Sequence, residues 1–207
     1  AMQSLLLGAQ LLGLDNVVVV QGDRLTDRDR DRLSAVNDVR PAELIALIQD
    51  LNRGVDFRGL KLRQPTQFSV GATIDLSRGL DAEVALTRRK VEAGAEFFLA
   101  QPTFDAQMSV RLFDGYAREY DEDLTPLVFH GVHIMSADGV RFADIPTWVT
   151  DDLDAGRSGD DIALQVIREY VDAGFTNLYI IPPILRGGRR DYDAAARVMG
   201  SARDRLG

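Results

Sequence analysis

Polar side chains follow several apolar stretches of this sequence, at positions where a buried strand would end. Four valines, 17–20, are followed by Gln21, Gly22 and Asp23. Polar residues recur at such ends along the chain, namely Asp23, Asp75, Gln101 with Asp105, and His130 or His133. A carboxylate supplies negative charge, and a carboxamide donates and accepts hydrogen bonds together, which suits the edge of a heterocyclic ring. Because α/β proteins bind ligands at the carboxyl ends of parallel strands, we expect Asp23, Gly71 and Gln101 to converge on one pocket.

The elements that position these residues alternate between strand and helix. The β-branched run 17–20 predicts a strand buried on both faces, as in parallel sheets. Strands are predicted at 16–21, 68–74, 96–101, 127–131 and 177–181. Helices are predicted at 41–51, 81–93, 106–120, 160–173 and 192–199, with Gly94, Gly174 and Gly200 as natural stops. The alternation predicts βα units around a parallel sheet.

Two α/β architectures contain such units. A five-stranded doubly wound sheet matches the strand count, but no glycine-rich phosphate loop follows any predicted strand. Polar groups at the ends of many strands suit the mouth of a (β/α)8 TIM barrel better than a single switch point. The length of 207 residues suits one domain with a sizeable core, so a single domain over residues 1–207 is predicted.

Composition limits the partners and the environment of the chain. A net charge of -8 and a pI near 4.8 argue against a nucleic acid or an acidic membrane surface as a partner. The absence of cysteine excludes disulfides and thiolate metal sites and fits a cytoplasmic protein. His130 and His133 have no carboxylate partner at helical spacing, so no metal site is predicted. No apolar run approaches the roughly 20 residues of a membrane span. The leucine-rich segment 4–14 lacks the basic residues that precede the apolar part of a signal peptide, so an amphipathic helix is predicted there instead.

The segment 89–105 carries a longer pattern, Arg-Lys-Val-Glu-Ala-Gly-Ala-Glu-Phe-Phe-Leu-Ala-Gln-Pro-Thr-Phe-Asp. Over its whole length it is similar to the signature K-V-D-A-G-A-x-F-x-x-T-Q-x-x-F-D of the 5,10-methylenetetrahydrofolate reductase family. The segments 52–59 and 65–72 look like a loop and the fifth strand of one branch of that family, and 21–23 looks like the Gly-Asp pair that ends its fourth strand. The resemblance runs from about residue 11 to residue 183. It implies a (β/α)8 barrel of which this chain holds five of eight βα units, the C-terminal two-thirds.

The resemblance also implies an enzyme of one-carbon metabolism and methionine biosynthesis. In that family FAD takes hydride from NAD(P)H and passes it to 5,10-methylenetetrahydrofolate, which gives 5-methyltetrahydrofolate. The implied cofactor is FAD, the co-substrate NAD(P)H, the substrate a tetrahydrofolate and the assembly a homo-oligomer. The family's proposed general acid, a glutamate on its first strand, precedes the matching region. Two alternatives stay open: a non-catalytic folate- or flavin-binding relative, and a TIM-barrel folate or corrinoid methyltransferase that needs no flavin.

Individual residues receive roles from the same resemblance. Asp23 would lie beside the flavin as the catalytic candidate, where its charge would tune the redox properties and its carboxylate would hydrogen-bond the folate. Gln101 would hold the edge of the pterin ring, and Arg186 the glutamate tail. Cofactor contacts are implied at Gln21, Gly22, Asp23, Gly71, Ala72, Glu83, Arg89, Lys90 and Ala95. Thr73 and Leu86 stand where members of the family have a tyrosine and a polar amide, so two contacts would be lost.

Two of these pairs have a physical rationale of their own. Gly71 and Ala72 are small enough for a flavin to lie close to the backbone. Arg89 and Lys90 are neighbours on a predicted helix and point about 100° apart. Together they could clamp a diphosphate at the helix edge, or both could be solvated.

Overall fold

The computed structural model describes residues 2–22, 39–140 and 145–206. The chain divides into two compact units. Unit 1 comprises Ala1–Ile74 and Ala85–Phe98, and unit 2 comprises Asp75–Val84 and Leu99–Gly207. The single domain expected over residues 1–207 stays a prediction.

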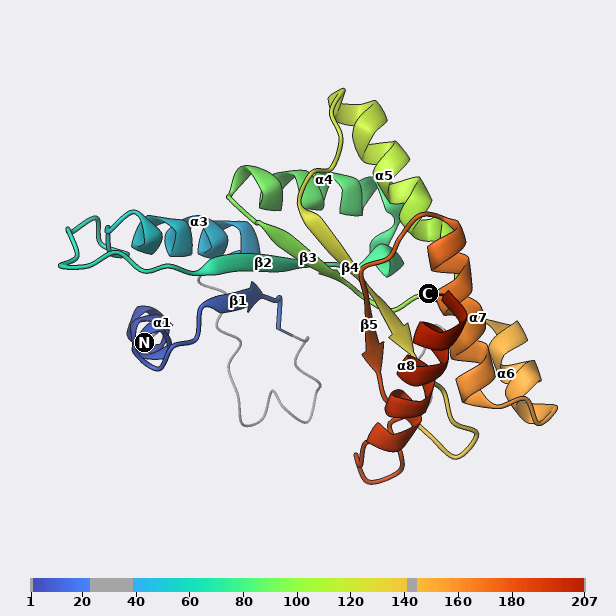
Figure 1. The fold of residues 1–207 in the computed structure, drawn as a ribbon. Coiled ribbons are helices and arrows are strands. Elements are labelled where there is room, and N and C mark those ends of the chain that lie inside the picture. Colours follow the sequence, from blue (N-terminus) through green and yellow to red (C-terminus); the bar gives the residue numbers. More distant parts are fainter. Residues whose placement is uncertain (1, 23–38, 141–144, 207) are drawn as a thin grey trace, which may run out of the picture. The chain divides into compact units, whose positions relative to one another are not determined.

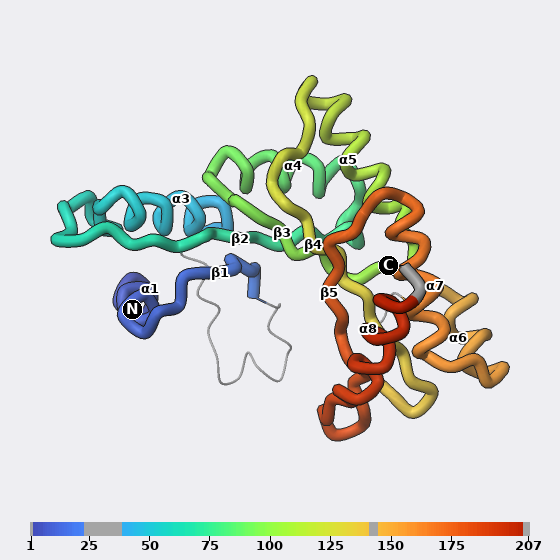
Figure 2. The backbone as a smooth tube through the Cα atoms, in the orientation of Figure 1, coloured from blue at the N-terminus to red at the C-terminus, as the bar shows by residue number. Residues whose placement is uncertain are grey.

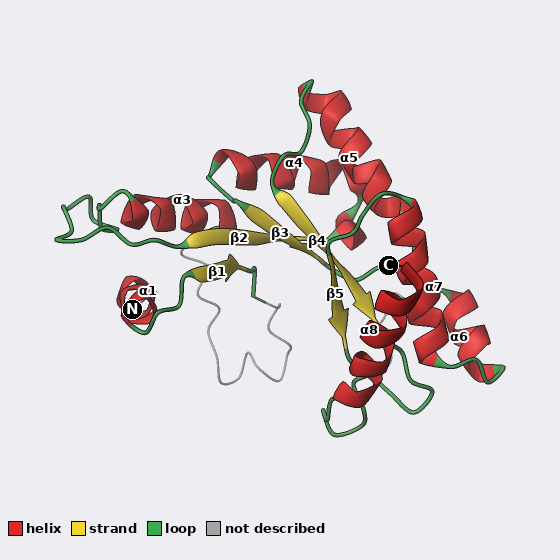
Figure 3. Cartoon of the chain, in the orientation of Figure 1, coloured by secondary structure: helices red, strands yellow, loops and turns green. Residues whose placement is uncertain are grey.

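Helices and strands alternate along the chain (Figure 3). The strands are β1 (Asn16–Val19), β2 (Ser69–Ile74), β3 (Phe97–Ala100), β4 (Leu127–His133) and β5 (Leu178–Ile181). They form a five-stranded sheet in the order β1-β2-β3-β4-β5, in which β1 is parallel to β2 and β4 is parallel to β5. The predicted parallel α/β fold is confirmed. Because the strand order follows the chain, these strands have no switch point of the kind that defines a doubly wound sheet. Closure into a (β/α)8 barrel stays a prediction.

One helix precedes the first strand, and the other described helices connect the strands or follow the last of them. They are α1 (Met2–Leu11), α3 (Pro41–Asn52), the 3-10 turn η1 (Leu76–Arg78), α4 (Leu80–Glu92), α5 (Gln107–Tyr120), α6 (Thr147–Asp154), α7 (Gly159–Asp172) and α8 (Tyr192–Leu206). Gly94 and Gly174, which follow α4 and α7, have φ angles of 101° and 88°, as expected of glycine stops. The predicted stop at Gly200 is wrong, because α8 continues through it and packs Ala202 against the core of unit 2. Across the described ranges no helix is both long and apolar enough to cross a membrane.

In unit 1, helix α3 contacts β1 and β2 and fixes where β2 begins. Its buried residues Ile45, Ile48 and Leu51 lie on one face. Asn52 at the end of the helix accepts from the backbone N–H of Phe68 at 2.9 Å and donates to the Phe68 carbonyl at 2.8 Å. These paired hydrogen bonds hold the residue before β2 against the end of α3, so the register of the strand is set by one side chain.

The first strand of unit 1 is less buried than its sequence predicts. Val17 and Val18 are only half-buried, and Val20, just after β1, is 61% exposed. The expectation of burial on both faces is wrong here, because β1 is the first strand in the sheet order and pairs with β2. The expected helix at 4–14 is present as α1, but none of its described residues is buried.

In unit 2, the hydrophobic core lies between one face of β4 and β5 and the helices α7 and α8, which Figures 1 and 2 show beside these strands. Val132 of β4 packs there with Ile167 and Tyr170 of α7 and Val198 of α8. A second cluster joins Met135 to α6 and the start of α7. Because one face of β4 and β5 is covered by helices, side chains that alternate to the other face are those available to a ligand.

Candidate functional site

Unit 2 contains a cavity of about 550 Å³ at the carboxyl ends of its strands. Gln101 follows β3, His133 ends β4 and Ile181 ends β5, and all three line the cavity. Asp75 and Ser77 line it from the segment that starts η1. The volume lies within the range typical of small-molecule sites. Of the three residues predicted to converge on one pocket, Gln101 lines this cavity, Gly71 is not among its lining residues, and Asp23 lies outside the described residues. Asp75 and His133, which the sequence showed as polar residues at strand ends, also line it.

The strand alternation decides which side chains reach the cavity. In β4, Val132 packs into the helical core, so the neighbouring Gly131 and His133 face the other way. In β5, Ile180 packs against the same core, and Tyr179 and Ile181 lie on the opposite face. The lining residues of these two strands therefore come from the face that the helices of unit 2 leave open.

Tyr179 braces the strands beneath this site. Its hydroxyl donates to the backbone carbonyl of Ala100 at 2.9 Å, which ties β5 to the end of β3 across β4. The ring crosses Gly131, where a Cβ atom would stand 2.8 Å from the ring carbon Cζ and from the hydroxyl oxygen. A side chain at 131 would therefore force the tyrosine ring to shift. Burial raises the pKa of Tyr179, so its hydroxyl keeps the proton that it donates.

The Asp75 carboxylate is held in a fixed orientation. Its Oδ1 atom accepts from the Ser77 backbone N–H at 3.2 Å and from the Ser77 hydroxyl at 2.6 Å. Its Oδ2 atom accepts from Arg78 Nε at 3.0 Å. Burial acts to raise the pKa of Asp75, but the hydrogen bonds from Ser77 and Arg78 outweigh it and hold the pKa below its usual value. The cavity therefore contains an oriented negative charge.

Gln101 presents a free carboxamide at the same edge. Its side chain is exposed, and among the described residues no protein group hydrogen-bonds it. Its neighbours are fixed: Phe104 meets Trp148 edge to face with ring centroids 6.2 Å apart, and Asp105 accepts from the Gln107 backbone N–H at 2.9 Å. The predicted cap at Asp105 is wrong in position, because Ala106 is the N-cap of α5, although Asp105 accepts from the first N–H of the helix. Phe104 both packs against the core and lines the cavity. Gln101 is left with an unused donor and acceptor at the cavity.

The two histidines have different environments. His130 is 1% exposed, and its Nδ1 atom lies 3.0 Å from the Ser109 hydroxyl. Its ring packs against Tyr170 and Phe175, and burial lowers its pKa to about 4. His133 lines the cavity, and its pKa is lowered first by burial and then by the positive charge of Arg190. His130 is a neutral core residue, and His133 is the histidine that lines the cavity.

The residues assigned to the flavin are placed as follows in unit 1. Gln21 and Gly22 follow β1 and are exposed, and Asp23 lies outside the described residues, so its catalytic role stays a prediction. Gly71 and Ala72 lie inside β2 and are buried. A Cβ at Gly71 would stand 2.4 Å from the ring of Phe97, so this glycine makes room for a neighbouring side chain.

The remaining assigned residues are spread over several environments. Arg89 is exposed, whereas Lys90 is 9% exposed and donates its Nζ to the Thr73 carbonyl at 2.6 Å, so the two do not share one surface. Glu83 is 1% exposed within the first turns of α4. Ala95 is buried and precedes the amino end of β3, whereas Gln101 follows the carboxyl end of the same strand. FAD binding stays a prediction.

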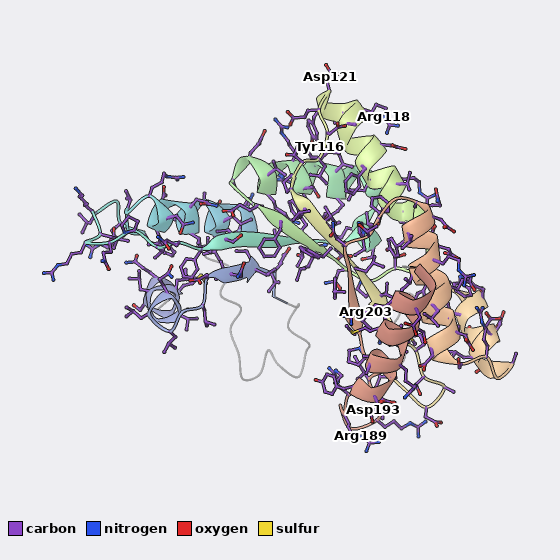
Figure 4. All side chains as sticks on the ribbon, in the orientation of Figure 1. Tyr116, Arg118, Asp121, Arg189, Asp193 and Arg203 are labelled. Carbon is purple, nitrogen blue, oxygen red and sulfur yellow. The ribbon has the colours of Figure 1, made fainter. Side chains whose placement is uncertain are left out.

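Arg186 lies in the exposed loop between β5 and α8. It does not line the cavity, although Ile184, two residues earlier, does. The loop is closed by an antiparallel pair of Ile184 and Arg190, and Arg190 donates to the Gly188 carbonyl at 2.7 Å. In Figure 4, Arg189 of this loop lies at the same end of α8 as Asp193. The assignment of Arg186 to a glutamate tail stays a prediction.

Several lining residues were not assigned to the site from the sequence. Asp75 and His133 were noted as polar strand ends but were given no role, and Ser77 and Thr103 were not considered. The usable signal was the end of each predicted strand, because Asp75 and Gln101 are each the first residue after a strand. The apolar lining, which includes Met108, Ile145 and Ile184, comes from segments far apart in sequence and carries no local signal.

Comparisons with known proteins show a similar fold in solved structures but no family to which the chain belongs. No protein-family model matches the sequence, and no curated protein matches it. A solved structure from Clostridium thermocellum, an uncharacterized protein that binds two copies of 5-methyl-5,6,7,8-tetrahydrofolic acid, matches with a TM-score of 0.50 and 14% identity over 70% of this chain and 59% of its own. A Burkholderia cenocepacia J2315 protein described as a putative lyase/mutase matches with a TM-score of 0.44 and 14% identity over 94% of this chain and 61% of its own.

The first of these matches shows a shared fold, and the second is too distant to support an argument. This chain spans about three-fifths of the length of either structure. Fold and cavity together define a parallel α/β protein with a cavity at the carboxyl ends of the strands in unit 2.

Proposed function

We propose that the cavity of unit 2 binds a reduced folate. The observation that carries this proposal is Gln101: its free carboxamide lies at the cavity, at the position where segment 89–105 resembles a folate-binding signature. One donor and one acceptor on a planar group match the N–H and carbonyl edge of a pterin ring. The folate-binding structure from Clostridium thermocellum supports the proposal, since it has a similar fold.

The shape of the cavity suits a bicyclic ring. Phe104, Met108 and Ile181 supply apolar surface, which would cover the faces of the ring while Gln101 holds its edge. Asp75 and His133 supply further polar groups at the same rim. A few polar groups within a mostly apolar lining are the arrangement that orients small ligands.

The finer proposal is that the protein reduces 5,10-methylenetetrahydrofolate to 5-methyltetrahydrofolate. Bound FAD, reduced by NAD(P)H, would supply the hydride. This proposal is supported by the resemblance of segments 89–105 and 21–23 to the reductase family, with Asp23 as the catalytic candidate. The second candidate, a folate-binding or methyl-transferring protein without flavin, is supported by Thr73 and Leu86, which stand where the reductase family has a tyrosine and a polar amide.

Titration calorimetry of the purified protein with 5-methyltetrahydrofolate tests the folate proposal. Gln101→Ala removes two hydrogen bonds to the ligand, so the affinity should fall by about tenfold or more. Gln67→Ala is the matched control, because Gln67 is exposed and does not line the cavity. No binding by the unmodified protein, or equal affinity of Gln101→Ala and the control, would refute the proposal.

Two measurements separate the finer candidates. Flavin absorbance of the purified protein, together with NAD(P)H oxidation that depends on 5,10-methylenetetrahydrofolate, is the expected result for the reductase. Folate binding by a protein that neither contains nor takes up FAD would reject the reductase and leave the flavin-free candidate.

A further inference from the structure

The Asp75 carboxylate has one hydrogen-bond acceptor position that the protein does not use. A carboxylate has about four acceptor positions on its two oxygens. Ser77 occupies both positions of Oδ1 through its backbone N–H and its hydroxyl, and Arg78 Nε occupies one position of Oδ2. Within the described residues no other group bonds Asp75. The remaining position belongs to Oδ2 of a residue that lines the cavity.

The orientation of this oxygen is fixed before any ligand arrives. Because both carboxylate oxygens are held by η1, the side chain cannot rotate without losing hydrogen bonds. The side chain is 29% exposed, so a ligand in the cavity can reach it without displacing the protein. A fixed and partly buried acceptor selects ligands more strongly than a mobile one, since it loses little entropy on binding.

The acceptor complements the carboxamide of Gln101 at the same cavity. Gln101 offers one donor and one acceptor, and Asp75 offers only an acceptor with negative charge. A ring with two N–H donors and one carbonyl along an edge would satisfy both side chains. The 2-amino-4-oxopyrimidine half of a pterin has this pattern, because its 2-amino group adds a donor to the N–H and carbonyl of the ring.

We infer that Asp75 is a specificity-determining residue that accepts a hydrogen bond from the exocyclic 2-amino group of a pterin. The inference rests on the proposed folate function and adds the group that the protein reads. A ring with a methyl group in place of the amino group leaves the charged oxygen without a donor. A ring with a carbonyl in place of the 2-amino group would bring its oxygen against the Asp75 carboxylate, and neither group can donate a hydrogen bond to the other. The site therefore selects 2-aminopteridines.

The test compares two ligands and three forms of the protein by titration calorimetry. The ligands are 5-methyltetrahydrofolate and its analogue with a 2-methyl group in place of the 2-amino group. The unmodified protein should bind the amino ligand at least about tenfold more tightly, because a hydrogen bond to a charged acceptor is lost with the analogue. Asp75→Asn should weaken binding of the amino ligand by about tenfold and change binding of the analogue by less than about twofold.

Asp105→Asn is the matched control, since Asp105 also follows a strand, also accepts a backbone N–H two residues later and lies outside the cavity lining. It should preserve the preference for the amino ligand. Failure of both ligands to bind the unmodified protein would reject the folate proposal itself. Tight binding of folate with no preference for the amino group would reject the role of Asp75 alone, even if Asp75→Asn does not fold. Equal losses for both ligands in Asp75→Asn would reject it as well.

Discussion

Replacement of Gly131 by alanine is expected to disturb the bracing of β3, β4 and β5 that supports the cavity. The added Cβ would stand 2.8 Å from Cζ and Oη of Tyr179 and 3.1 Å from the Ala100 carbonyl oxygen. Non-bonded carbon atoms prefer separations of about 3.5–4.0 Å, so the ring must retreat by more than about 0.5 Å. The tyrosine hydroxyl then loses its 2.9 Å hydrogen bond to Ala100.

The magnitude follows from two costs. Overpacking in a fixed interior costs about 1–3 kcal/mol, and the lost hydrogen bond adds about 0.5–1.5 kcal/mol. Gly131→Ala should therefore lower the free energy of unfolding by about 2–4 kcal/mol. Urea denaturation followed by circular dichroism measures this change, with Tyr179→Phe as the control that removes only the hydroxyl.

A double-mutant cycle tests the stated cause. In a Tyr179→Leu background the ring and its hydroxyl are absent, so Gly131→Ala should cost at least about 1 kcal/mol less than in the unmodified protein. An equal cost in both backgrounds would show that the effect of the alanine does not come from the tyrosine ring. A cost below about 0.5 kcal/mol in the unmodified protein would refute the close packing itself.

Two further predictions concern stability. Burial lowers the pKa of His130 to about 4, below the usual value near 6.5 of the unfolded chain. Stability from the neutral ring is therefore complete above pH 6.5 and is lost as the pH falls toward 4, by up to about 3 kcal/mol. His130→Phe should flatten this part of a plot of unfolding free energy against pH, and an unchanged profile would contradict the assignment. Lys90→Met should lower the free energy of unfolding by about 1–3 kcal/mol in urea denaturation, because it removes the hydrogen bond to the Thr73 carbonyl. The control Arg89→Met, at an exposed position, should change this free energy by less than about 0.5 kcal/mol. Equal losses of stability in the two variants would contradict the difference in burial.

The predictions about ligands and about stability are independent. Gly131 and Tyr179 lie beneath the site, and His130 lies in the core on the other face of β4, so their effects on unfolding do not depend on which ligand binds. Gln101 and Asp75 contribute to the cavity lining, and their replacement is tested by affinity. A protein that shows the stability effects but binds no folate would keep the described structure and lose the proposed function.

Sequence patterns that act locally determined the elements of this fold. Apolar runs located the five strands of the described sheet, and helical periodicity located helices α3, α4, α5, α7 and α8, because each pattern reflects the backbone conformation of its own segment. Gly94 and Gly174 ended helices as expected, since their φ angles of 101° and 88° are strained for other residues. Gln101 and Asp75 were recognisable as polar residues at strand ends for the same reason.

Tertiary structure decided which of these residues line the cavity and which pack against other parts of the protein. The sequence could not separate His133 from His130, because that choice depends on which face of β4 the helices cover. It interpreted Gly71 as room for a ligand, whereas the ring of Phe97 from the next strand fills that room. It paired Lys90 with Arg89, whereas the Thr73 carbonyl binds Lys90. Each of these outcomes depends on a neighbour that is distant in sequence, and local periodicity contains no information about such neighbours.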